Sequence, residues 1–186
     1  MKRAFLIGLC TLIALGLTSA GELAGISMPD NTTVEGKDLV LNGMGLREKM
    51  WIDVYVAGLY LEDKSGDAQQ ILDSEQAKHI RMHFLYKKVA AKKLVGAWND
   101  GVKNNAGSQA GELKSGLEQL NSWMVDLVKG EEMVFTSVPG KGLRVEVKGE
   151  EKGVIEDEAF SKAFWSIFIG EKPPTDRLKQ GLLGAS

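Results

Sequence analysis

LVLNGMGLR (residues 39–47) and WIDVYVAGLYL (residues 51–61) are the two stretches that decide the fold of this 186-residue chain. Apolar residues alternate with other residues in both stretches, which is the pattern of half-buried β-strands. The charged residues 47–49 predict a turn between them, and therefore a β-hairpin. The first stretch has a G-x-G spacing, but it lacks the third glycine and the following helix of a dinucleotide-binding loop. These glycines therefore indicate a twist of the backbone beside a neighbouring element.

After this hairpin, the spacing of apolar residues changes between the two-residue period of strands and the 3.6-residue period of helices. Strands before helices, and then a second hairpin with further helices, indicate an α+β fold with a mostly antiparallel sheet. After residue 61 we expect a helix capped near residue 67, a strand over 79–84, helices from about 90 and over about 109–129, strands over 133–138 and 143–148, a helix from about 156 to 169, and a last helix after 173.

The N-terminal segment has the pattern of a secretory signal peptide. Lys2 and Arg3 precede an apolar run over residues 4–17, and small residues end it at Ala20. The alternative is an uncleaved anchor. Cleavage after Ala20 would leave one domain over residues 21–186, and no later apolar run is long enough to span a membrane. Because the signal segment looks bacterial, we expect export across the inner membrane to the periplasm.

Composition excludes several classes of function. The net charge of −2, which becomes −4 without Lys2 and Arg3, gives no basic footprint for nucleic acid. The single cysteine, Cys10, cannot form an internal disulfide or a cysteine-based zinc site. His79 and His83 lie on a predicted strand, where four residues span about 13 Å, too far to share a metal ion. We therefore expect no metal and no cofactor. The oligomeric state stays open.

A basic cluster lies around the start of the first central helix. It comprises Lys87, Lys88, Lys92 and Lys93. A solvated face is the simplest interpretation, and attraction to an acidic partner or to a membrane surface is the alternative.

Arg47 and Tyr55 are the candidate binding residues. They lie eight residues apart on the two strands of the predicted hairpin. If the hairpin brings them to one face, a guanidinium and a phenol converge beside Trp51. Such a pair can hold an anionic group by charge-assisted hydrogen bonds, with aromatic walls around the rest of the ligand. The alternative is an exposed turn arginine and a tyrosine that only packs.

The chain resembles the chalcone isomerase-like family, in its bacterial exported branch. The resemblance rests on NGMGLR (42–47) followed by AGLYLED (57–63), and on IGEKP (169–173) followed by GLLG (181–184). It implies an open-faced β-sandwich, in which a layer of helices packs on a large antiparallel sheet and leaves a ligand cleft between them. Some members close a chalcone to a flavanone, a reaction that needs orientation and stabilisation of negative charge. Other members bind fatty acids, with an arginine and a tyrosine on the carboxylate.

The residues at the matching positions favour a binder over an enzyme. The family's arginine matches Arg47, and Tyr55 stands where the enzymes have a threonine. The enzymes' helix-start tyrosine is replaced here by Lys92-Lys93, and a polar residue near the closing motif is replaced by Ile167. These changes remove polar groups that the isomerase would use.

Three functions remain open from the sequence. The first is non-catalytic binding of a small amphipathic anion, fatty-acid-like or phenolic. The second is an intramolecular lyase (an isomerase) acting on a chalcone-like enone, with Arg47 as the catalytic residue that stabilises the enolate. The third is a partner-binding module without a small ligand. Candidate apolar walls of the cleft are Trp98, Phe164 and Phe168, which also fit a plain helix core.

Overall fold

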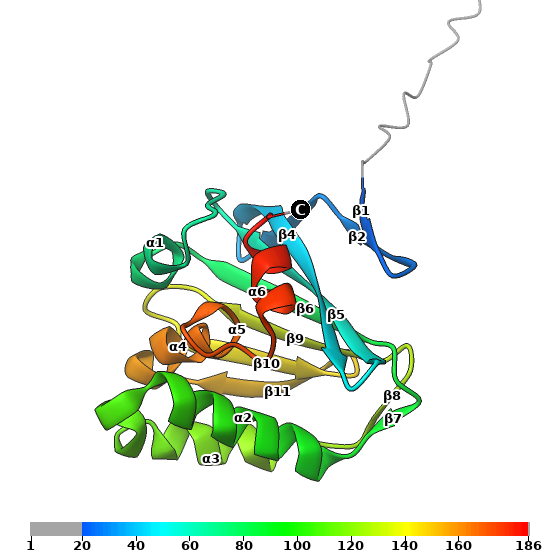
Figure 1. Cartoon of the computed structure of the whole chain (residues 1–186). Coiled ribbons are helices and arrows are strands. Elements are labelled where there is room, and N and C mark those ends of the chain that lie inside the picture. The colour runs from blue at the N-terminus through cyan, green and yellow to red at the C-terminus, as the bar shows by residue number, and fades with distance from the viewer. Residues whose placement is uncertain (1–19, 186) are drawn as a thin grey trace, which may run out of the picture.

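A seven-stranded antiparallel sheet is the centre of the molecule. The computed structural model describes residues 20–185, and Figure 1 shows its elements. The order of strands in the sheet is β11-β10-β9-β6-β5-β4-β3. These strands span Asn31–Val34 (β3), Lys37–Lys49 (β4), Ile52–Leu61 (β5), Lys78–Phe84 (β6), Glu132–Ser137 (β9), Leu143–Val147 (β10) and Glu150–Ile155 (β11). Two short ribbons lie outside the sheet: β1 (Ala20–Leu23) with β2 (Ile26–Pro29), and β7 (Lys88–Val89) with β8 (Leu127–Val128).

The longer helices pack along one face of the sheet, and α2 and α3 form its lower layer in Figure 1. The helices are α1 (Ala68–Asp73), α2 (Ala91–Asn105), the 3-10 turn η1 (Gly107–Gly111), α3 (Lys114–Ser122), α4 (Glu158–Phe164), α5 (Ser166–Ile169) and α6 (Asp176–Leu182). The α+β prediction with a mostly antiparallel sheet is therefore confirmed. None of the helices within residues 20–185 is long and apolar enough to cross a membrane.

Side chains cap the starts of three helices, and the cap expected near residue 67 is one of them. Asp67 accepts hydrogen bonds from the first backbone N–H groups of α1, Asp157 does the same for α4, and Thr175 for α6. A carboxylate or hydroxyl at this position satisfies N–H groups that have no partner within the helix.

The β4–β5 hairpin forms as predicted, but its turn lies later than residues 47–49. β4 continues to Lys49, Lys49 pairs with Ile52, and Met50-Trp51 is the two-residue turn. Irregular register between Arg47 and Glu48 marks a bulge, so the charged residues stay in the strand. The charged residues 47–49 therefore do not mark the turn. Charged side chains can also face solvent at the end of a strand, as Lys49 does here at the end of β4.

The glycines of the first motif let helix α6 pack directly on β4. A Cβ at Gly43 would collide with the carbonyl oxygen of Gly181, and a Cβ at Gly45 with that of Leu178. The C-terminal helix therefore lies backbone against backbone on the strand, as the motif predicted for a neighbouring element. Asn42 stabilises this contact. Its side-chain amide donates a hydrogen bond of 2.8 Å to the carbonyl oxygen of Leu182 and one of 3.0 Å to that of Ser65.

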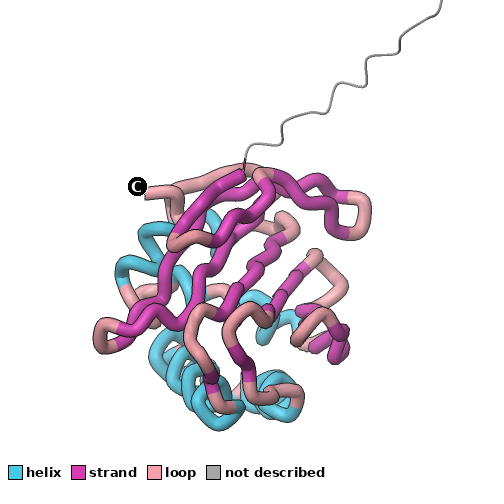
Figure 2. The backbone as a smooth tube through the Cα atoms, turned by 90° about the vertical axis from the view of Figure 1, so that its right-hand side faces the viewer, coloured by secondary structure: helices cyan, strands magenta, loops and turns pink. Residues whose placement is uncertain are grey.

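The opposite face of the sheet is partly covered by the β1–β2 ribbon. Met28 is buried there against Leu46 and Val56. Figure 2, turned by 90°, shows this ribbon at the end of the sheet that is remote from α2 and α3. The predicted signal peptide falls almost entirely on residues outside the described part of the chain, which begins at Ala20.

Two helix predictions need correction. The helix expected over 109–129 is η1 followed by α3, which ends at Ser122, and Leu127 lies in strand β8. Leu127 is nevertheless buried, so its apolar character fitted the helical stripe although its backbone pairs with Val89. The helix expected up to residue 169 is interrupted at Trp165, which separates α4 from α5.

Candidate ligand-binding site

Arg47 and Tyr55 are directly opposite each other on β4 and β5. Directly opposite residues of antiparallel strands project from the same face, with Cβ atoms about 5 Å apart. This face is the one that the helices cover, because Ala57 and Leu59 of β5 belong to the same buried cluster as Tyr55. Arg47 and Tyr55 therefore share one face of the sheet, which the sequence alone left open. That this pair binds a ligand stays a prediction.

Arg47 forms no ion pair with an acidic side chain of residues 20–185. Its Nη1 donates a short hydrogen bond to the backbone carbonyl of Glu48, and the residue as a whole is half-buried. Within residues 20–185 the other arginines all form ion pairs with glutamates: Arg81 with Glu132, Arg144 with Glu35 and Glu151, and Arg177 with Glu48. No ion pair of the described residues includes Arg47. A half-buried arginine that lacks a carboxylate can therefore accept one from a ligand.

Tyr55 is a buried phenol that stays protonated. Its side chain is only 7% exposed, and its ring lies 5.6 Å from that of Phe84. Burial raises the pKa of Tyr55 well above its usual range, and the nearby Arg47 charge offsets a smaller part of this rise. The hydroxyl is therefore available as a hydrogen-bond donor at any ordinary pH. Phe84 was not singled out from the sequence, although the alternation of β6 already placed it on the buried face.

Trp51 does not line the pair. It lies in the hairpin turn and is 94% exposed, because the turn comes later than predicted. The aromatic wall beside Tyr55 is Phe84 instead.

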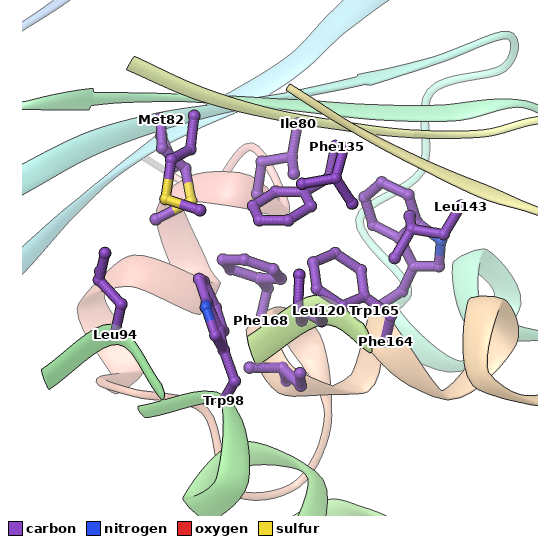
Figure 3. Close-up of a cluster of buried hydrophobic side chains, with 14 of the residues drawn as sticks. Ile80, Met82, Leu94, Trp98, Leu120, Phe135, Leu143, Phe164, Trp165 and Phe168 are labelled. Carbon is purple, nitrogen blue, oxygen red and sulfur yellow. The ribbon is translucent and has the colours of Figure 1, made fainter. Parts of the chain in front are cut away.

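Trp98, Phe164 and Phe168 form one aromatic cluster between the helices and the sheet. Their rings lie between 5.5 and 6.2 Å from one another, and each is at most 3% exposed. Phe135 of β9 joins them, 4.6 Å from Phe164 (Figure 3). In this arrangement the rings fill the layer between sheet and helices. Their role as walls of a ligand cleft stays a prediction, and it requires the rings to separate.

Two surface pockets lie away from these residues. The larger, about 490 Å³, lies beside α1, the end of α2 and α4, and the smaller is about 40 Å³. Three carboxylates line the larger pocket, and its one lysine, Lys162, already pairs with Glu75 and Glu158. Neither pocket is lined by Arg47, Tyr55 or the aromatic cluster, and the larger one does not suit an anion.

The structure places the residues at the two positions where the resemblance expected polar groups. Lys92 and Lys93 are exposed on the first turn of α2, and Ile167 is buried in the apolar core. The two histidines lie on the opposite face of β6, where His79 contacts Thr136 and His83 contacts Glu132. No group of three or more metal-binding side chains occurs within the part of the chain that the structure describes.

Comparison with known proteins agrees with this architecture. A family model described as chalcone isomerase-like matches residues 20–184. The structure is also similar to the crystal structure of a fatty-acid binding protein from Arabidopsis thaliana, with a TM-score of 0.69 and 18% sequence identity over 89% of this chain and 96% of that one. At this identity the likeness concerns the fold. Among curated protein sequences, none matched the chain.

Proposed function

The chain belongs to the chalcone isomerase-like family, and we propose that within it this protein is a non-catalytic binder of a small amphipathic anion, fatty-acid-like or phenolic. The observation that carries the proposal is the Arg47–Tyr55 pair. It combines a half-buried arginine that forms no ion pair within residues 20–185 and a phenol held in its protonated form.

The geometry of the pair supports an anionic head group as the ligand's polar end. The guanidinium supplies charge and paired N–H donors, and the phenol supplies one O–H donor from the adjacent strand. The other described arginines already pair with glutamates. A ligand's carboxylate or phenolate should therefore gain the most binding free energy at Arg47.

The surroundings support an apolar remainder of the ligand. Tyr55 belongs to the same buried cluster as Leu94, Trp98 and Phe168, which lie between the sheet and the helices (Figure 3). A hydrocarbon chain or a second aromatic ring would extend into this layer and displace ring contacts. The Arabidopsis neighbour is described as a fatty-acid binding protein, which favours a fatty acid among the candidates.

The lack of catalytic polar groups supports binding rather than isomerisation. The positions at which the resemblance expects polar residues hold exposed lysines at the start of α2 and the buried Ile167. A site with Arg47 alone can stabilise an enolate, but it lacks the groups that orient water and move protons.

Native mass spectrometry and a fatty-acid titration test the proposal. Arg47→Ala should lower the affinity for a long-chain fatty acid about 10- to 100-fold, since a hydrogen-bonded charge contributes about 1.5–3 kcal/mol. Arg47→Lys should recover part of this loss, because it restores charge without the planar donor pair. Arg177→Ala, an exposed arginine paired with Glu48, is the matched control and should bind like the wild type. Equal affinity of the wild type and Arg47→Ala, or chalcone turnover above background without ligand binding, would reject the proposal.

We also propose that the protein acts outside the inner membrane, in the periplasm. The basis is the signal-like pattern of residues 1–20. N-terminal sequencing of the protein from the periplasmic fraction should give Gly21 as the first residue. Recovery of the full chain in the membrane fraction would favour an uncleaved anchor instead.

A further inference from the structure

Exposed apolar side chains gather at one end of the molecule. Within residues 20–185, the large apolar side chains that are exposed belong to two segments only: Met50 (81%), Trp51 (94%) and Ile52 (41%) in the β4–β5 turn, and Val125 (39%) and Val128 (41%) at β8. Both segments lie at the lower right of Figure 1. Backbone hydrogen bonds connect them through the end of β6, since Leu85 N–H donates to Val54 and Gly130 N–H donates to Phe84. We call residues 49–52 the hairpin tip.

The backbone of the hairpin tip is strained in order to present these side chains. Met50 and Trp51 have φ angles of +50° and +67°, in the left-handed region that disfavours residues with a large side chain. A two-residue turn of this kind ordinarily contains Asn-Gly, which adopts the same conformation at little cost. Instead, the chain places a methionine and a tryptophan there and exposes both. Strain combined with apolar exposure indicates a function for the tip other than stability.

The charges around the hairpin tip have one predominant sign. The exposed lysines Lys49, Lys87, Lys92, Lys93 and Lys129 form no ion pair with any described residue. Most nearby acids are neutralised: Glu48 pairs with Arg177, Asp126 with Lys88, and Glu131 with Lys148. Asp53 is the one exposed acid of the tip strands outside these ion pairs. On a chain with a net charge of −2, this end is therefore locally positive.

We propose that the hairpin tip docks the protein onto a lipid bilayer that contains anionic lipids. Tryptophan prefers the interface between head groups and hydrocarbon, and the adjacent Met50 and Ile52 add apolar side chains that can enter with it. Each lysine near an anionic surface strengthens binding about fivefold. A convex two-residue turn presents too little area for a standard protein interface, which buries about 800 Å² on each partner. A bilayer, in contrast, closes around a convex tip.

Docking at this end would bring the membrane close to the candidate site. Arg47 lies near the end of β4, three residues before Met50 of the turn, which corresponds to about 10 Å. An amphipathic anion leaving the bilayer would therefore meet Arg47 first. This consequence rests on the proposed function, whereas docking itself does not.

Vesicle flotation of the purified protein tests the proposal. The wild type should float with vesicles of equal parts phosphatidylcholine and phosphatidylglycerol, and less with phosphatidylcholine alone. High salt should weaken the binding, because it screens the lysines. The double variant Met50→Asn/Trp51→Gly should bind at least tenfold more weakly. It should also melt about 2–4 °C higher, because the turn strain is removed.

Two matched variants test the charge term and the specificity. Lys87→Glu/Lys129→Glu should weaken binding to the anionic vesicles, whereas Lys64→Glu/Lys103→Glu, exposed lysines away from the tip, should have little effect. The wild type should float without added fatty acid, so a failed ligand proposal leaves this result unchanged. Absence of binding to anionic vesicles, undiminished binding of the double tip variant, or a dimer that depends on Trp51 would each overturn the proposal.

Discussion

Arginines in the described part of this chain pair with glutamates, except at Arg47. Arg47 lies on β4 directly opposite the buried Tyr55. Two residues earlier on the same face, Gly45 packs against helix α6. A guanidinium costs free energy to bury even partly, and a carboxylate partner normally offsets that cost. An arginine that stays half-buried without one is therefore better explained by a ligand than by stability.

His79 should make the stability of the fold depend on pH. Its ring is half-buried against Thr136, with Nδ1 2.8 Å from the hydroxyl oxygen, and Tyr60 packs edge-on against it. Burial lowers the pKa of His79 to about 4, and the neighbouring Arg81 charge adds to the effect. The folded chain therefore binds fewer protons than the unfolded chain between about pH 6.5 and pH 4, so stability is full above pH 6.5 and falls as the pH falls.

Denaturant titrations across this pH range measure the effect. The loss attributable to His79 is at most roughly 3 kcal/mol, and His79→Gln should remove it from the difference between the two pH values. A His79→Gln slope equal to that of the wild type would show that other groups determine the acid sensitivity.

At the scale of elements, the contact between α6 and β4 links the two family motifs. The glycines of β4 and Gly181 of α6 let the two backbones touch, and Asn42 donates a hydrogen bond to the last turn of the helix. Helix α6 therefore helps to hold the strand that carries Arg47. Arg177 of α6 also forms an exposed ion pair with Glu48 near the end of β4, and a pair of this kind contributes little to stability.

Gly45→Ala should destabilise the protein by about 1–3 kcal/mol or more, because the new methyl group meets the backbone of Leu178, which cannot rotate away. Gly96→Ala is the matched control in α2, where nothing lies within 4 Å of an added Cβ. It should stabilise the protein by about 0.5–1 kcal/mol, since alanine favours a helix over glycine. Urea denaturation of both variants checks the pair. A neutral Gly45→Ala would contradict the close packing of α6.

Elements were predictable from the sequence where pattern and capping agreed. The alternation of β6 and the cap near residue 67 matched the structure. β5 forms as a strand, but it is buried on both faces from Tyr55 to Leu61 and is not half-buried as its pattern indicated. The error at Leu127 has a physical cause: a buried leucine fits a helical stripe and a short strand equally, and only the pairing of β8 with β7 distinguishes them. β1 to β3 are four residues each, too short for a periodic signal.

For the whole molecule, the sequence predicted the architecture better than the site. The sequence left open whether Arg47 and Tyr55 share a face, and local parity could not decide it. Continued from the pairs Lys49–Ile52 and Glu48–Asp53, a regular register would place Arg47 opposite Val54, and only the bulge brings it opposite Tyr55. The position of Trp51 was predicted wrongly, since β4 continues through the charged residues to Lys49 and the turn is Met50-Trp51. The packing of Trp98, Phe164 and Phe168 depends on contacts between three helices and the sheet, which no local pattern contains.

The position of a bound fatty acid tests the central claim most directly. A crystal structure of the protein with a long-chain fatty acid should show the carboxylate within hydrogen-bond distance of both the Arg47 guanidinium and the Tyr55 hydroxyl. The hydrocarbon chain should lie between the sheet and the helices, with the rings of Trp98 and Phe168 moved apart. A carboxylate bound elsewhere, for example at Lys162 in the pocket beside α1 and α4, would contradict the account.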